Sequence, residues 1–190
     1  MKLNWKKVTD FLQDHPDGHI IALDEMSLYF QATTTRLWAL VGQTPVVRVS
    51  PQRDHVHFYG AVNLRTGHEF ALPTPDMTSE TTAAFLRDLL LGYPTQPLLL
   101  LWDRASWHKG EAVKQVIADH PRLTTVFFPP ASPHLNPQEH VWSQARAAVS
   151  HNHTCATFSQ LTQSFLNFLS SNLFPFAWLN KHAPAILFEV

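Results

Sequence analysis

PLLLLWD, residues 97–103, is a short apolar run that ends on an aspartate. A run of this length and composition indicates a strand that is buried on both faces of a sheet. HIIALD, residues 19–24, has the same form and also ends on an aspartate, and LTTVFFPP, residues 123–130, is a third apolar run. The three segments therefore predict the central strands of one sheet.

A helical pattern precedes each of the two predicted strands 97–103 and 123–130. Residues 78–94 and 110–121 carry apolar side chains at helical spacing and end in Gly or Pro. Strands that alternate with helices pair in parallel through right-handed crossovers. Further strands are predicted at the edge of the sheet: VVRVS (46–50), HVHFYGAVNL (55–64) and HEFAL (68–72). Further helices are predicted to flank the sheet, over residues 4–14, 137–149 and 157–171. The prediction is an α/β fold with a mixed sheet, antiparallel edge strands and flanking helices.

The bulk properties narrow the function classes. The chain has 190 residues, which is enough for one domain with a substantial core, and its formal net charge is −1. The chain therefore lacks the excess of positive charge that is typical of a nucleic-acid-binding protein. A lone cysteine, Cys155, excludes an internal disulfide framework, and no apolar stretch approaches the ~20 residues of a membrane span. The charged N-terminal stretch lacks a signal-peptide core, so we expect a cytoplasmic protein.

Acidic residues at two predicted strand ends indicate a binding site. Ligands of open α/β sheets collect beyond the carboxyl ends of the parallel strands, where Asp24 and Asp103 lie. Two neighbouring carboxylates repel each other unless a cation lies between them, and Mg²⁺ favours such oxygen ligands. Two alternatives stay open at this stage: Glu25 is the functional acid of the first strand, in place of a merely terminating Asp24, or Asp103 caps the following turn. If Asp24 is the ligand, Glu25→Gln should be mild.

A third carboxylate lies in SPHLNPQEHVW, residues 132–142. Asn136 is a favourable N-cap residue and Pro137 suits the first helical position, so Glu139 falls at the third position of the helix. There it can complete a capping box with Asn136. Metal binding and the capping box compete for this carboxylate.

Histidine-rich segments raise the alternative of a zinc site. His55 and His57 share one face of a predicted strand, and HNHTC holds His151, His153 and Cys155. Neither group has the paired spacing of a structural zinc site. We therefore do not favour zinc.

Four segments together resemble the catalytic domain of DDE-superfamily transposases, in the bacterial insertion-sequence branch related to mariner. The segments are IIALDEMSLYF (20–30), RLWALVGQTP (36–45), LLLLWDRASWHKG (98–110) and VFFPPASPHLNPQEHVW (126–142). The last contains the family's Ser-Pro-x-Leu-Asn-Pro-x-Glu-x-x-Trp motif, and 35 residues separate Asp103 from Glu139, as in such proteins. The resemblance covers about residues 19–150.

The resemblance implies a ribonuclease-H-like fold and a metal-dependent enzyme. Asp24, Asp103 and Glu139 would be the catalytic metal ligands for two ions of Mg²⁺ or Mn²⁺. The enzyme would cleave DNA at the ends of a mobile element and transfer the freed 3′ hydroxyl into target DNA. The residues implied as second-shell groups or DNA contacts are His108, Lys109, Arg104 and Asn136, although relatives often have asparagine at position 104.

The resemblance also bears on domains and partners. Residues 1–18 are expected to form a short linker or helix, and residues 19–190 the catalytic domain. Relatives carry a helix-turn-helix module upstream, so we expect the DNA-binding module to be separate or missing. The partners would be element-end DNA and target DNA, and two copies of the chain would form a homodimer in the active complex. The protein would be associated with the nucleoid when it acts. A ribonuclease-H-fold nuclease that only hydrolyses, and an inactive domesticated interaction domain, are the alternatives.

Overall fold

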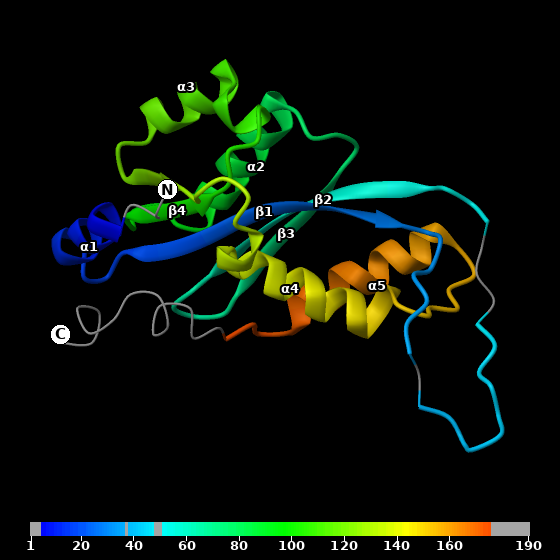
Figure 1. The fold of residues 1–190 in the computed structure, drawn as a ribbon. Helices are drawn as coiled ribbons and strands as arrows, with labels where there is room; N and C mark the ends of the chain where they lie inside the picture. Colours follow the sequence, from blue (N-terminus) through cyan, green and yellow to red (C-terminus); the bar gives the residue numbers. More distant parts are fainter. Residues whose placement is uncertain (1–4, 37, 48–50, 176–190) are drawn as a thin grey trace.

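The computed structural model describes residues 5–36, 38–47 and 51–175. This part of the chain forms five strands and five α-helices, with three short turns of 3₁₀ or π helix (Figure 1). The elements are α1 (Trp5–Asp14), β1 (His19–Tyr29), β2 (His55–Asn63), β3 (Glu69–Thr74), α2 (Ser79–Leu91), β4 (Leu98–Trp102), the 3₁₀ turn η1 (Trp107–Lys109), α3 (Glu111–Asp119), β5 (Leu123–Phe127), the 3₁₀ turn η2 (Pro133–Leu135), α4 (Pro137–Ala145), the π turn η3 (Arg146–Ser150) and α5 (Phe158–Ser171).

The strands form one mixed sheet in the order β3-β2-β1-β4-β5. β1, β4 and β5 pair in parallel, and β2 and β3 continue the sheet as an antiparallel edge. β4 is buried along its whole length, as its continuous apolar sequence predicts. The α/β class and the mixed sheet with an antiparallel edge are confirmed.

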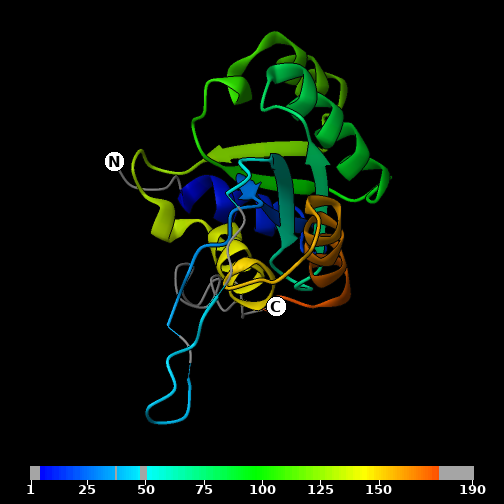
Figure 2. The same ribbon diagram turned by 90° about the vertical axis from the view of Figure 1, so that its right-hand side faces the viewer.

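Helices cover both faces of the sheet (Figure 2). α2 and α3 pack on one face, against side chains such as Leu100 and Trp102. α1, α4 and α5 pack on the other face, around Ala22, Met26 and Leu101. α1 contributes buried apolar side chains to this second core cluster, so the helix at the start of the chain packs with the sheet as one unit. The chain is thus a three-layer α/β/α sandwich.

β1 is longer than the sequence predicts. The prediction ends the first strand at Asp24, whereas β1 runs to Tyr29. Its parallel pairing with β4 stops at Ala22, but its antiparallel pairing with β2 continues to Tyr29. The polar residues after Asp24 conceal the strand in the sequence, because their side chains find polar partners rather than solvent. Asp24 therefore lies at the end of the parallel pairing and not at the end of the strand.

Two other predicted boundaries differ from the structure. Val46 and Val47 of the predicted strand 46–50 are not in a strand, and Val46 is exposed, while residues 48–50 lie outside the described part of the chain. The helix predicted over 137–149 is α4 followed by the π turn η3. The other predicted helices and central strands agree with the structure to within a few residues.

A buried polar cluster fixes the start of α4 against the edge of the sheet. The side chain of Gln138 is fully buried; its Oε1 accepts from the backbone N of Val62 at 2.9 Å, and its Nε2 donates to Glu69 Oε1 at 2.7 Å. Burial raises the pKa of Glu69 well above its ordinary value. A side chain at Gly60 would collide with Gln138, Glu69 and Trp142. The absence of a Cβ at Gly60 therefore lets α4 approach β2.

Gly60→Ala should destabilise the chain by about 1 to 3 kcal/mol, because the added methyl group overpacks a site that cannot expand. Chemical denaturation monitored by circular dichroism measures this change. Gly92→Ala is a matched control, since Gly92 has φ −69° and its nearest contact to an added Cβ is Leu89 O at 3.3 Å. Equal stability of the two variants would contradict the close approach of α4 to β2.

Candidate active site

Three separate elements bring the predicted carboxylates to one side of the sheet. Asp24 is half-buried in β1, on the strand face that carries Ala22 and Met26 toward α4. Asp103 directly follows β4, and Glu139 lies in the first turn of α4. Asp24 is thus placed by strand alternation and the other two by the ends of their elements.

These carboxylates line one pocket with a volume of ≈ 400 Å³. The rest of its wall comes from Arg104, Ala105, Asn136 and the proline-rich segment 128–133. The structure therefore brings together Asp24, Asp103 and Glu139 with two of the predicted neighbouring groups, Arg104 and Asn136.

The electrostatics of the pocket centre on Asp24. Burial raises the pKa of this carboxyl group to about 8, with further contributions from the negative charges of Glu25, Glu139 and Asp103. A divalent cation would relieve both causes, and three carboxylates are the hard oxygen donors that Mg²⁺ and Mn²⁺ accept. Within the described ranges, no three His, Cys, Asp or Glu side chains are grouped as a formed metal site. The residues fit a divalent ion in their chemistry, and ion binding would have to draw the carboxylates together.

The predicted capping box at α4 is wrong. The side chain of Asn136 caps the helix by accepting from Gln138 N at 3.1 Å. Its backbone N, however, donates to Pro133 O at 2.9 Å within the preceding 3₁₀ turn. Because this turn already satisfies the N–H of Asn136, Glu139 has no cap to complete. The Glu139 carboxylate is exposed and accepts no hydrogen bond from a described residue, so it remains available to the pocket.

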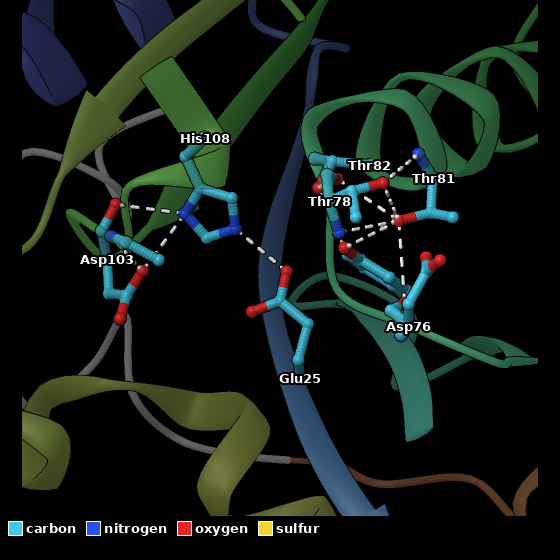
Figure 3. A network of polar contacts seen from close by, with 9 residues as sticks. Glu25, Asp76, Thr78, Thr81, Thr82, Asp103 and His108 are labelled. Carbon is cyan, nitrogen blue, oxygen red and sulfur yellow. Dashed lines mark hydrogen bonds and ion pairs between the residues drawn. The ribbon is translucent and has the colours of Figure 1, made fainter. Parts of the chain in front are cut away.

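His108 is a buried neighbour of Asp103 and not a surface residue at a helix start. Its side chain is fully buried, and its ring stacks on Trp102 with centroids 4.5 Å apart. Nδ1 lies 3.0 Å from Asp103 Oδ1 (Figure 3). Burial lowers the pKa of His108, but hydrogen bonds to Asp103 and Glu25 outweigh it and raise the pKa to about 9. The His108 hydrogen bond in turn lowers the pKa of Asp103.

Sequence reasoning missed the role of Glu25. Figure 3 shows this residue on the opposite side of the His108 ring from Asp103, with Glu25 Oε1 2.7 Å from Nε2. Its side chain is 4% exposed. Glu25 is thus a partner of His108 and not a spare acid beside Asp24, and the expectation that Glu25→Gln is mild stays a prediction. The signal in the sequence is strand alternation, which turns Glu25 to the sheet face opposite Asp24, the face that carries Trp102.

The two basic candidates have different surroundings. Arg104 donates from Nε to Phe128 O at 3.4 Å and lies over the ring of Phe127, 5.5 Å from its centroid. It therefore ties the loop after β4 to the loop after β5 at the rim of the pocket. Lys109 is exposed, and its positive charge contributes to the lowered pKa of Asp103.

The histidine groups considered for zinc make other contacts. His57 Nδ1 lies 2.8 Å from Ser27 Oγ, and His153 Nε2 lies 2.8 Å from Phe30 O. His153 also stacks on the Phe30 ring. These histidines join the end of β1 to β2 and to the segment after η3. Separately, no helix in the described part of the chain is long and apolar enough to cross a membrane.

Comparisons with known proteins place this fold in a family. Residues 19–162 match the family model described as DDE superfamily endonuclease. The chain is 22% identical over 167 residues to the "Insertion element IS630 uncharacterized 39 kDa protein" of Shigella sonnei, covering 87% of this chain and 48% of that protein. The chain thus spans about half the length of this relative.

Solved structures of a mariner transposase share the fold. The Mos1 transposase paired-end complex with left transposon end has a TM-score of 0.67 at 14% identity, covering 94% of this chain and 56% of that one. The catalytic domain of Mos1 mariner transposase gives a TM-score of 0.62 at 12% identity, covering 94% and 83%. Mos1 paired-end complexes with Mn and with Mg are also similar. These likenesses confirm the predicted ribonuclease-H-like fold.

Asp24→Asn should stabilise the metal-free chain more at alkaline than at acidic pH. Folded Asp24 keeps its proton up to a pKa of about 8, whereas its ordinary pKa is 3.8. The stability from this raised pKa is complete below the lower value and is lost as the pH rises to the higher one. Asparagine has no such loss, so in chelator at about pH 9 we expect a melting temperature at least about 4 °C above wild type, because each pKa unit corresponds to about 1.4 kcal/mol, and a smaller gain at about pH 5.

Thermal melts followed by circular dichroism at the two pH values measure this difference. Asp88→Asn, on the exposed side of α2, is the control and should change the melting temperature equally little at both. A gain for Asp24→Asn that is the same at both pH values would argue against a raised pKa at Asp24.

Proposed function

Because the chain belongs to the DDE superfamily endonucleases, we propose that it is the catalytic part of a DNA transposase. It would cleave a DNA strand at the ends of a mobile element and join the freed 3′ hydroxyl to target DNA. One observation carries this proposal: carboxylates from β1, the end of β4 and the start of α4 line a single pocket, where burial and then their charges raise the pKa of Asp24.

Asp24, Asp103 and Glu139 are the residues that would hold the metal. Their donors suit Mg²⁺ or Mn²⁺, and we propose two ions in the active complex. When bound, such ions activate the attacking oxygen and stabilise the leaving oxygen of a phosphodiester.

The protein's own contribution is to position these groups. Asn136 caps α4, and Gln138 anchors its first turn to the sheet, so that Glu139 enters the pocket from a rigid helix end. Arg104 holds the proline-rich loop that forms the opposite wall. Such positioning is most of what an enzyme supplies in phosphoryl transfer.

The DNA would continue from the pocket along α4. Arg146 follows Glu139 by seven residues, which is about two helical turns and 10 Å along the same helix face. It lines a hollow of ≈ 340 Å³ with Ser150, His151 and segment 26–33, and no acidic residue of the described part of the chain contributes to that hollow. A phosphate beside the cleaved one would find a cation there. Lys109 is an exposed cation near Asp103.

The proposal extends to partners. Element-end and target DNA would be the substrates, and two copies of the chain would act together in the active complex. Since the net charge is −1, we expect the chain to bind DNA weakly and without sequence preference. End recognition would then require a DNA-binding module besides the residues of the pocket.

Asp24→Asn, Asp103→Asn and Glu139→Gln should each abolish Mn²⁺-dependent nicking of plasmid DNA without unfolding the chain, because each keeps the side-chain volume and removes a metal ligand. A loss of at least about 100-fold is expected for a ligand that acts directly on the ion. Asp88→Asn is the matched control. Joining of a labelled 3′ end into plasmid separates a transposase from a nuclease that only hydrolyses, and a wild-type chain without any nicking would point to an inactive interaction domain.

Arg146→Ala should weaken duplex DNA binding and lower the slope of log affinity against log salt by about 1, since one phosphate contact is lost. Fluorescence anisotropy between about 50 and 200 mM salt, with Ca²⁺ present, measures this slope. Arg87→Ala, on the exposed side of α2 and thus across the sheet, is the control. If both variants changed the slope equally, the proposed DNA path along α4 would be wrong.

A further inference from the structure

We infer that Glu25 is a positioning residue that fixes the orientation of the Asp103 carboxylate through the ring of His108. The inference rests on the proposed function, because it concerns how Asp103 presents an oxygen to a metal ion. It assigns a role to a buried acid that lies outside the pocket and is not one of the proposed ligands.

A continuous chain of contacts links β1 to the loop after β4. Glu25 Oε1 lies 2.7 Å from His108 Nε2, and His108 Nδ1 lies 3.0 Å from Asp103 Oδ1. Nδ1 is also 3.3 Å from the backbone O of Asp103. Figure 3 shows the ring between the two carboxylates, so each ring nitrogen is committed to one side.

The ring has little freedom to take another orientation. His108 stacks on Trp102 with an interplanar angle of 18°, and Trp107 meets it edge-on at 80°. Its side chain is 0% exposed. Because one ring face stacks on Trp102 and both nitrogens have partners, a displacement of Glu25 would move the atom that contacts Asp103.

The two carboxylate oxygens of Asp103 have different surroundings. Oδ1 faces His108 and also accepts from Ala105 N at 2.9 Å. Oδ2 receives no hydrogen bond from a described residue. One oxygen is therefore fixed by the protein, and the other remains for a ligand in the pocket, which is the arrangement that outer-shell groups impose on ligating carboxylates.

Stability alone is a weak explanation for this chain of contacts. A buried ion pair often contributes little to stability compared with apolar residues of similar volume, because both charges lose their hydration. Glu25 lies at 4% side-chain exposure on the sheet face that carries the buried apolar cluster of Leu23 and Trp102, where an apolar residue would avoid the loss of hydration. The Glu25–His108 pair contacts the pocket carboxylate of Asp103 on the side away from the pocket. This position is the one expected of a pair that orients the Asp103 carboxylate.

The test compares two substitutions of Glu25 in the full chain. Glu25→Leu fills the space but cannot accept a hydrogen bond, whereas Glu25→Gln keeps an acceptor without the charge. Mn²⁺ affinity measured by isothermal titration calorimetry should fall about 10–100-fold in Glu25→Leu, as for other lost outer-shell partners. Glu25→Gln should stay within about fivefold of wild type, because a neutral acceptor retains about half of the interaction. Thermal melts verify the fold of each variant.

Two further variants separate positioning from general destabilisation. If Glu25 acts through His108, Glu25→Leu combined with His108→Ala should bind Mn²⁺ no more weakly than His108→Ala alone. His153→Ala is the matched control, since His153 also stacks on an aromatic ring and contacts a backbone oxygen, but far along β1 from Asp24. It should lower the melting temperature without changing Mn²⁺ affinity.

The outcomes distinguish this inference from the proposed function. A wild-type chain that binds Mn²⁺ and loses it in Asp103→Asn, but not in Glu25→Leu, would overturn the inference and leave the proposed function standing. Additive losses in the double variant would also overturn it. A wild-type chain that binds no Mn²⁺ would overturn both. Weakened binding in Glu25→Leu, restored in Glu25→Gln and not additive with His108→Ala, supports the positioning role.

Discussion

The separation of β1 from β4 after Ala22 is the constraint on which the site depends. Up to that residue the two strands are paired in parallel, and beyond it β1 continues only with β2. Asp24 lies just past this point and Asp103 just past the end of β4. The opening leaves two carboxylates near each other at the border of a dry core, where burial and like charges raise the pKa of Asp24. A bound proton or a bound cation stabilises such a site. Without either, the charged carboxylates repel one another and lose hydration, which destabilises the site.

Both faces of the sheet contribute to this opening. On one face, Gln138 and Glu69 hold α4 so that Glu139 enters the same pocket. On the other face, Glu25 contacts His108, and His108 contacts Asp103. The sheet thus carries Asp24 and the anchored start of α4 on one side and the contacts that reach Asp103 through His108 on the other, and the loop after β4 connects the two. This division explains why consecutive residues of β1, Asp24 and Glu25, have different tasks.

The comparisons connect this geometry with a family in which the fold is shared over long sequence distances. Identity to the Mos1 structures is 12–14%, yet the TM-score reaches 0.67. What the chain shares with the DDE superfamily endonucleases over residues 19–162 includes the strand ends and the start of α4. These elements place the carboxylates, so the shared region contains the parts of the fold on which the pocket depends.

The sequence by itself determined the central strands, the crossover helices and the identity of the three pocket carboxylates. Apolar runs and helical periodicity are local signals, and the motif around Glu139 is long enough to be specific. Three other features were visible only in the structure. The extension of β1 to Tyr29 depends on its pairing with β2, and the capping box is absent because the local 3₁₀ turn before α4 already satisfies the backbone N–H of Asn136. The link from Glu25 to Asp103 joins residues 78 positions apart in the chain through a ring that has to be buried first. Contacts of this kind arise from packing between distant segments, and no local pattern encodes them.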